Sequence, residues 1–325
     1  MKHVYNRLGS VLGAIAFLAT ATPAFSQSPH TPVSDDGSVV APTEASPGTG
    51  SAATSSAPSA GPSRVTEQAL IAEGVYFDAE SRAEFQRLAA LPDGGEYGVR
   101  TRGSAAESII GPDTRERLYT VNYPTRAKVL ITFTGGRCSG VMIGPNTVST
   151  AGHCVHTGGP GGAFRTVSSY RIYPGRDGAV SPYGVCTART LYTVLGWTLA
   201  SDEEYDYGAI KLNCTVGNTV GWFGMTTAAP TYFPTVVGGY PGDKPLTQWQ
   251  SSDRVRALST RQVFYRNDTF GGHSGSPVWY DIAGPYMFGI HAYGLHGAGS
   301  HAIYNHGVRL VAAVFNNLLA WRNAP

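Results

Sequence analysis

Residues 271–277 read GGHSGSP, a serine flanked by glycines. Glycine adopts a positive φ without steric cost, so this turn could direct the N–H groups of Gly272 and Ser274 at one point. Two converging N–H groups beside a serine hydroxyl are what a hydrolase needs when that hydroxyl attacks a carbonyl and an oxyanion forms. Ordinary surface turns also have this composition. The pattern therefore predicts a nucleophile at Ser274 only if the chain supplies a base and an acid that orients the base.

A histidine and an aspartate with suitable surroundings lie upstream. His153 follows an apolar, β-rich run at 140–144, which places it just past the end of a strand. Asp206 opens an alternating strand at 205–212, where small neighbours permit close packing and partial burial. The order His, Asp, Ser is that of chymotrypsin-type enzymes and not of subtilisins or α/β-hydrolases. The chain is therefore predicted to carry a triad of His153, Asp206 and Ser274.

Together these motifs resemble the chymotrypsin-fold serine endopeptidases, and further stretches resemble the bacterial glutamyl endopeptidases. Those stretches are SIIGPDTR at 108–115, MIGPNTV at 142–148, GYPGDK at 239–244 and GIH at 289–291. The similarity covers residues 108–325. It implies an all-β fold of two six-stranded antiparallel β-barrels with a C-terminal α-helix. It also implies acyl-enzyme chemistry at Ser274, with an oxyanion hole made by the N–H groups of Gly272 and Ser274.

The resemblance further implies a preference for glutamate, and less for aspartate, before the cleaved bond. Thr269 and His291 match the family positions that hold the substrate carboxylate, and a hydroxyl and an imidazole can both donate to that group. Family members can also use the freed amino terminus of the mature chain, which here is Ser108 or Ile109. His273 is interpreted as a surface neighbour of the nucleophile. The alternatives are an active endopeptidase of different specificity and an inactive protease-fold binding module.

The chain begins with the pattern of an export signal. A positively charged start is followed by an apolar run at 11–21 and a small-residue cleavage site at 24–26. The apolar run is too short to span a membrane. Four cysteines, an even number, suit an oxidising compartment. We expect a signal peptide at 1–26 and a secreted protein, extracellular or periplasmic, without a membrane anchor.

Two disulfides are expected. The fold commonly carries a bridge beside the catalytic histidine, and the resemblance assigns it to Cys138 and Cys154. The second bridge follows from the residues themselves. If the runs at 191–198 and 207–212 form an antiparallel hairpin centred near Ala200, residues whose numbers sum to about 400 face each other, which brings Cys186 opposite Cys214.

The segment before the protease domain changes character along its length. Residues 27–63 are dominated by Ser, Pro, Ala, Thr and Gly, and cannot bury enough apolar surface to offset the entropy lost on ordering. They are predicted to form a disordered linker. Helical patterns at 67–71 and 79–91 predict a partly helical propeptide at 64–107, with an ordinary helical extension as the alternative.

The junction with the protease domain carries its own cleavage signal. Glu107 directly precedes Ser108, where the similarity begins, so a glutamate-specific protease would cut this bond. We therefore predict autocatalytic maturation. Many short apolar runs and 41 glycines, which suit tight turns, are typical of barrels. The predicted boundaries are an N-terminal barrel at 108–228, a C-terminal barrel at 229–307 and a helix at 308–323.

Four histidines recur every five residues, at His291, His296, His301 and His306. That spacing fits neither one face of a helix nor one face of a strand, and glycines interrupt the run. Neither cysteine nor acidic residues join it. The sequence therefore predicts no metal site and no cofactor, and the last three histidines are interpreted as loop residues.

Composition narrows the range of partners. The formal net charge is only +2, and charged residues make up 14% of the chain, against about 25% in an average domain. With no basic stripe in addition, this argues against nucleic-acid binding. Protein or peptide substrates are the expected partners, and the enzyme is expected to act as a monomer.

Overall fold

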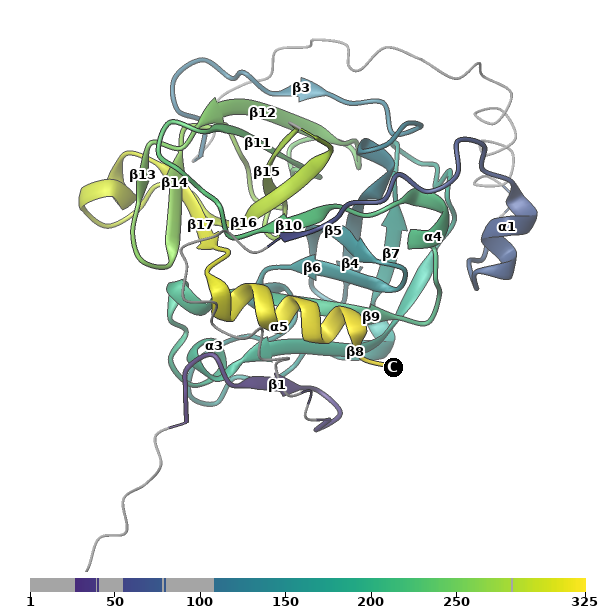
Figure 1. Cartoon of the computed structure of the whole chain (residues 1–325), viewed down its shortest axis with the longest axis horizontal. Helices are drawn as coiled ribbons and strands as arrows, with labels where there is room; N and C mark the ends of the chain where they lie inside the picture. The colour runs from purple at the N-terminus through teal and green to yellow at the C-terminus, as the bar shows by residue number, and fades with distance from the viewer. Residues whose placement is uncertain (1–26, 39, 41–54, 78, 80–107, 282) are drawn as a thin grey trace, which may run out of the picture.

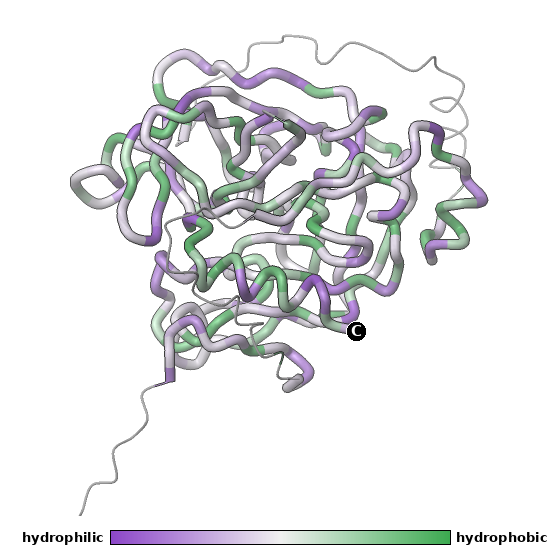
Figure 2. The backbone as a smooth tube through the Cα atoms, viewed as in Figure 1, coloured by the Kyte–Doolittle hydropathy of each residue, from purple (hydrophilic) through white to green (hydrophobic). Residues whose placement is uncertain are grey.

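The computed structural model of the chain describes residues 27–38, 40, 55–77, 79, 108–281 and 283–325. Two largely antiparallel sheets lie one above the other, and the last helix crosses the lower one (Figure 1). Hydrophobic stretches follow the strands and that helix (Figure 2), because burial of apolar side chains is the dominant favourable contribution to folding. The predicted all-β class with a C-terminal helix is confirmed.

The lower sheet closes into a six-stranded barrel. Its strands run in the order β8-β7-β4-β5-β6-β9, and β8 pairs with β9 to close the ring. Val129, Ile131 and Ile210 are among its fully buried side chains. The strands are β4 (Lys128–Phe133), β5 (Gly136–Gly144), β6 (Thr147–Thr150), β7 (Arg171–Pro174), β8 (Cys186–Val194) and β9 (Gly208–Leu212).

The upper sheet is open and forms a half-barrel instead of the second closed barrel that we expected. Among the described strands no ladder joins its two edges. β3 and β10, which the predicted boundary assigns to the first barrel, pair instead with β12 and β16 of this sheet. Its strands are β2 (Ser55–Ser56), β3 (Glu116–Arg117), β10 (Gly224–Thr226), β11 (Pro234–Gly239), β12 (Trp249–Arg254), β13 (Ala257–Leu258), β14 (Gln262–Tyr265), β15 (Pro277–Asp281), β16 (Pro285–Tyr293) and β17 (Asn305–Arg309).

Within the described residues, helices are few and short. The α-helices are α1 (Glu67–Ala72), α3 (Leu195–Ala200), α4 (Gly217–Val220) and α5 (Ala312–Asn323). The 3₁₀ turns are η1 (Thr125–Ala127), η2 (Gly152–Cys154), η3 (Val167–Ser169), η4 (Glu203–Tyr205) and η5 (Gly299–Ala302). None of the helices in the described ranges has the length and apolar character that crossing a membrane requires.

The C-terminal helix packs on the first barrel. Val314, Leu318 and Trp321 are buried at helical spacing, and Trp321 stacks on Tyr192 of β8 with ring centroids 5.6 Å apart. The helix begins later than the predicted residue 308. Val308 and Arg309 instead belong to β17, where they pair with residues of β14 and β16.

Two short parts of the segment 27–63, which was predicted to be disordered, form strands. β1 (Pro32–Ser34) pairs with β8, and β2 pairs with β10. Composition measures how much apolar surface a segment can bury, but it does not register the hydrogen bonds that an open strand edge offers. The predicted helix at 67–71 corresponds to α1. The signal peptide at 1–26 and residues 80–91 of the second predicted helix lie outside the described residues.

Both expected disulfides are present. Cys138 bonds Cys154, and Cys186 bonds Cys214. The hairpin argument for the second bridge is confirmed by the register, because Tyr192 faces Ala209 in the β8–β9 ladder.

Candidate active site

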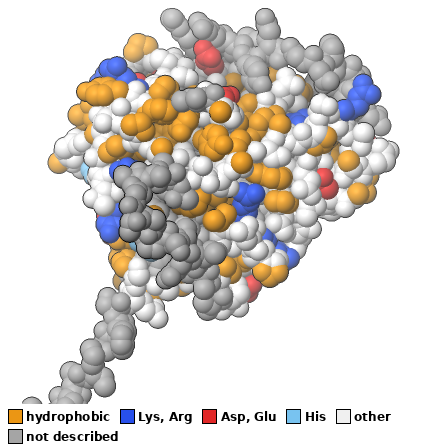
Figure 3. Space-filling view, in the orientation of Figure 1, with side chains coloured by type: hydrophobic (Ala, Val, Ile, Leu, Met, Phe, Trp, Pro, Cys, Tyr) orange, Lys and Arg blue, Asp and Glu red, His pale blue; other side chains and the backbone are white. Residues whose placement is uncertain are grey.

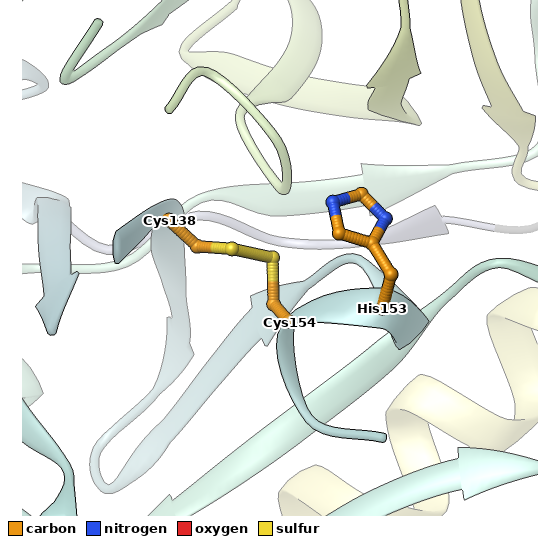
Figure 4. Close-up of side chains that lie close together, drawn as sticks. All are labelled: Cys138, His153 and Cys154. Atoms are coloured by element: carbon orange, nitrogen blue, oxygen red, sulfur yellow. A yellow bond between two sulfur atoms is a disulfide. The ribbon is translucent and has the colours of Figure 1, made fainter. Parts of the chain in front are cut away.

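His153 lies in η2, just past the end of β6. Gly152 must be small, because a Cβ there would come within 2.9 Å of Asp206 Oδ1. The His153 side chain keeps 28% of its surface exposed, so it remains accessible to a substrate. The Cys138–Cys154 disulfide lies beside it (Figure 4), and since the two sulfurs are bonded to each other, neither is a thiolate ligand for a metal.

Asp206 directly follows η4 and is fully buried. Its Oδ1 accepts a hydrogen bond from the backbone N–H of His153 at 2.7 Å, and its Oδ2 lies 2.7 Å from His153 Nδ1. Tyr293 OH donates to the same Oδ2 at 2.5 Å. Three donors thus hold one buried carboxylate. This arrangement places the His153 proton on Nδ1 and leaves the lone pair on Nε2, where a proton acceptor needs it.

The electrostatics of His153 suit a base. Burial disfavours its charged form, but the charge and hydrogen bond of Asp206 outweigh burial, and the pKa of His153 is raised above its ordinary value. Arg165 opposes the rise through its positive charge. Its guanidinium donates to the backbone carbonyl of His153 at 3.0 Å, which helps to hold the residue in place. A proton taken up by this ring is therefore stabilised by Asp206.

The loop that carries Ser274 requires glycine at two positions. Gly272 has a φ of 105°, and a Cβ there would lie 2.7 Å from the carbonyl oxygen of Tyr240. Gly275 has a φ of 87°, and a Cβ there would overlap the carbonyl oxygen of Ser139. The glycines that flank Ser274 in the sequence are thus explained by backbone conformation and by close approach.

Ser139, on β5, ties this loop to the first barrel. Its Oγ donates to the carbonyl of Gly272 at 2.8 Å, and its N–H donates to the carbonyl of Ser274 at 2.8 Å. The N–H groups of Gly272 and Ser274 donate to no residue that the structure describes, so they are available to an oxyanion. Ser274 is half-buried, and among the described residues its Oγ has no hydrogen bond to His153. Such bonds often tighten only when substrate binds.

His291, on β16, is paired directly with the nucleophile loop. Its carbonyl accepts from Gly275 N at 2.7 Å, and its N–H donates to Ser276 O at 2.9 Å. Burial, and then the neighbouring histidines, hold the pKa of His291 well below its ordinary value, so the ring is neutral. Tyr265 OH lies 2.7 Å from His291 Nδ1, and burial raises the pKa of Tyr265 so that it keeps its proton. A neutral phenol can donate or accept, so the direction of this bond depends on the tautomer of His291; where Tyr265 donates to Nδ1, the ring proton lies on Nε2.

Thr269 is fully buried, and its Oγ1 has no hydrogen-bond partner among the described residues. Its backbone N–H donates to the carbonyl of Ser108 at 3.2 Å, and Asn305 Nδ2 donates to the same carbonyl at 2.6 Å. A Cβ on Gly294 would overlap Ser108 Oγ. Ser108 therefore packs between the nucleophile loop and the end of β16. Glu107 lies outside the described residues.

The interpretation of His273 as a surface residue is wrong. Its side chain is fully buried, and its Nδ1 accepts a hydrogen bond from the N–H of Phe270 at 3.0 Å. Burial, reinforced by the charge of Arg115, lowers the pKa of His273 to about 3. The tight turn leaves Ser274 half-buried and directs the side chain of His273 inward, where its neutral ring accepts the hydrogen bond from Phe270.

Sequence reasoning missed Ser139, Tyr265 and Tyr293. Tyr293 lies two residues after His291, so regular alternation would place both side chains on one face of β16. A register shift in the β16–β17 ladder lies between them and turns Tyr293 toward Asp206. Ser139 and Tyr265 act through partners that are distant in the sequence, and no local pattern distinguishes either of them.

Comparisons with known proteins place the chain in a family. Residues 119–314 match the Trypsin family. The glutamyl endopeptidase of Bacillus licheniformis is 36% identical over 313 residues, which cover 91% of this chain and 89% of that protein. A Bacillus subtilis protein named extracellular metalloprotease is 40% identical over 229 residues, 66% of this chain and 70% of that one.

Solved structures point the same way. A structure of a Glu endopeptidase in complex with MPD aligns with a TM-score of 0.59 at 27% identity, and the alignment covers 66% of this chain and 100% of that one. The residues that match the Trypsin family include His153, Asp206 and Ser274. The chain belongs to the trypsin family of serine endopeptidases and, within it, to the bacterial glutamyl endopeptidases.

Proposed function

We propose that Ser274, His153 and Asp206 cleave peptide bonds through an acyl-enzyme. Ser274 Oγ attacks the carbonyl carbon while His153 Nε2 takes its proton, and His153 then returns this proton to the leaving amine. The N–H groups of Gly272 and Ser274 hold the oxyanion. The observation that carries the proposal is the pair of 2.7 Å contacts from Asp206 to the backbone and ring of His153.

We further propose that the enzyme cleaves after glutamate, and less readily after aspartate. His291 is neutral, and in the tautomer in which Tyr265 donates to Nδ1 its Nε2–H can donate a hydrogen bond to the substrate carboxylate. Thr269 Oγ1, which no described residue engages, supplies a second donor. A hydrogen bond to a charged acceptor is roughly twice as strong as one between neutral groups.

The amino terminus of the mature chain would add a positive charge at the same place. Cleavage of the Glu107–Ser108 bond frees the α-amino group of Ser108, whose carbonyl is held by Thr269 N and Asn305 Nδ2. An ammonium group there would attract the substrate carboxylate. On this proposal the chain is a secreted zymogen, with a signal peptide at 1–26 and a propeptide at 64–107 that the mature enzyme lacks.

Matched peptides that differ only in the residue before the reporter group test the proposal. We expect the highest kcat/KM for Glu, a lower value for Asp and very slow cleavage for Phe and Arg. A preference for Phe or Arg would support an endopeptidase of different specificity. Failure to hydrolyse any of the four, together with resistance to a serine-directed phosphonate, would support an inactive binding module instead.

A further inference from the structure

Three histidines converge with a glutamate outside the proposed catalytic site. Residues 294–304 join β16 to β17 and fold back through η5 (the yellow loop at the left of Figure 1), where His296 N donates to the carbonyl of His301 at 2.9 Å. The ring centroids of His296, His301 and His306 lie 4.7 to 5.4 Å apart. Glu203 reaches them from η4, and one ligand atom from each of Glu203, His301 and His306 lies within 4.8 Å of the others.

This convergence is what the five-residue spacing could not predict. The spacing argument assumes a regular helix or strand, but the turn of η5 brings His301 back over His296 and His306. The acidic partner, Glu203, is remote in sequence and comes from the linker between β8 and β9 of the other sheet.

His306 is the side chain that most needs a partner. Its side chain is fully buried, and neither of its ring nitrogens makes a hydrogen bond of good geometry to any described residue. The nearer carboxylate oxygen of Glu203 lies 3.6 Å from Nε2, beyond hydrogen-bonding distance. Buried imidazole nitrogens without partners are uncommon, and a bound cation would satisfy one of them.

The hydrogen bonds of the other two histidines also leave lone pairs for a cation. His301 Nε2 lies 2.8 Å from Gln262 Oε1, so the proton is on Nε2 and Nδ1 keeps its lone pair. His296 faces an acceptor at each nitrogen, the carbonyl of Gly294 at 3.2 Å and the carboxylate of Glu203 at 3.1 Å. A neutral ring has only one proton, so one of these contacts calls for a positive charge, either on the ring or on an ion.

We propose that Glu203, His296, His301 and His306 bind one Zn²⁺ ion. Imidazole nitrogens and a carboxylate oxygen are ligands that zinc prefers, and four protein ligands make a closed, structural site. Donor atoms around one zinc ion lie about 3.3 Å apart. The ligand atoms of Glu203, His301 and His306, which lie within 4.8 Å of one another, therefore draw together by up to about 1.5 Å when the ion enters. Gln262 and the Gly294 carbonyl then hold the outer N–H groups of His301 and His296, as the partners of metal-bound histidines commonly do.

The ion would bridge the two sheets beside Asp206, because its ligands come from both of them. Glu203 belongs to η4, which ends directly before Asp206, whereas His296 and His301 belong to the β16–β17 connection. His306 lies in β17, so its interpretation as a loop residue is wrong. His306 stacks on Tyr293 with ring centroids 5.4 Å apart, and Tyr293 OH donates to Asp206. Zinc binding therefore stiffens the segment that carries Asp206. This effect does not depend on which residue the enzyme prefers before the cleaved bond.

The test uses the full chain with Ser274→Ala, so that self-cleavage does not consume it. After removal of metal with a chelator, we expect calorimetric titration with Zn²⁺ to saturate at one ion per chain. Co²⁺, bound in place of zinc, should show the visible absorption of a four-coordinate site. Excess Zn²⁺ should raise Tm by about 5 °C or more.

Variants in the same background locate the site. His301→Ala and Glu203→Gln replace partly exposed side chains, and each should weaken Zn²⁺ binding by at least about 10-fold and abolish the Tm shift. His153→Ala, the matched control, removes an imidazole outside the cluster and should leave both unchanged. Absence of saturable binding, or binding that survives both cluster substitutions, would overturn the proposal and leave His296 and Glu203 as an ordinary ion pair. The Co²⁺ spectrum of the Ser274→Ala chain decides the question without any cluster variant.

Discussion

Asp206 receives its three hydrogen bonds from both halves of the molecule. The backbone and ring of His153 belong to the first barrel, and Tyr293 belongs to β16 of the second sheet. A buried carboxylate with three donors is held in one orientation, and it holds His153 in turn. Tyr293 contacts Asp206 and not the proposed nucleophile or base directly by a hydrogen bond, so we expect it to act as a positioning residue.

Replacing Tyr293 with phenylalanine should therefore lower activity without removing the base. Hydrogen bonds to charged groups contribute about 1.5–3 kcal/mol, so we expect kcat/KM to fall on the order of 10-fold. The phenyl ring can still stack on His306. Because Asp206 loses a donor, its carboxylate should attract the His153 proton more strongly, and the acid limb of the pH profile should move to higher pH. Unchanged kinetics and an unchanged pH profile would exclude a positioning role for Tyr293.

The pH dependence of the parent enzyme follows from His153. Only the neutral ring can accept the proton of Ser274, and Asp206 raises the pKa of His153 despite burial. Activity should be full at alkaline pH and decline as the pH falls through a value above the ordinary histidine pKa of about 6.5. The logarithm of kcat/KM against pH shows this limb directly. A rate that stays flat from about pH 8 to pH 5 would rule out His153 as the base.

At this scale, a residue can be proposed from sequence where it carries its own local pattern. Ser274 sits between glycines, and His153 and Asp206 lie at strand ends, where the structure brings the last two into contact. Ser139 and Tyr293 act only through contacts between the sheets, and these depend on register and on a bulge that the sequence does not display. The burial of His273 could not be predicted from the sequence either, because it depends on how the turn that carries Ser274 is oriented.

At the scale of elements, the β8–β9 hairpin shows what strand geometry can predict. Antiparallel pairing fixes the sum of facing residue numbers, and this placed Cys186 opposite Cys214. The leader strand β1 shows the opposite case, because its pairing with the edge of β8 has no signature in a stretch rich in Ser and Pro. Open edges of the folded domain decide where such a segment lies.

Removing the second disulfide should destabilise the domain and spare the chemistry. The bridge closes a segment of sequence separation 28, for which chain entropy gives a loss of about 3–4 kcal/mol in the free energy of unfolding. We expect the double variant Cys186→Ala and Cys214→Ala to unfold at a lower temperature by about 10 °C, with kcat nearly unchanged. Calorimetry in a Ser274→Ala background and kinetics in the active chain measure the two effects. An unaltered Tm would contradict this account of the hairpin.

At the scale of the whole molecule, the proposed catalytic groups lie where the two sheets meet. The closed barrel supplies His153 and Asp206, and the open sheet supplies Ser274, His291 and Tyr293. Charged side chains are sparse over the visible face, and Lys and Arg are scattered there (Figure 3). The boundary between the halves was expected between residues 228 and 229, but β3 and β10, which precede it, pair with strands of the second sheet. Chain order does not determine which sheet a short strand joins.

The proposed maturation step connects the candidate active site with the propeptide that precedes Ser108. If the enzyme cuts its own chain at Glu107, the secreted Ser274→Ala variant should retain its propeptide, and Glu107→Gln should be processed slowly at this bond. Amino-terminal sequencing of the secreted chains measures both. Normal processing of the Ser274→Ala chain would show that another protease makes the cut.

The central claim is that His291 and Thr269 select a carboxylate, and a matched pair of peptides tests it most directly. The two peptides carry Glu or Gln before the cleaved bond, so they differ in charge but hardly in shape. We predict that kcat/KM for Glu exceeds that for Gln by about 100-fold or more, because only the carboxylate satisfies both donors as a charged acceptor. Equal rates for the two peptides would contradict the account.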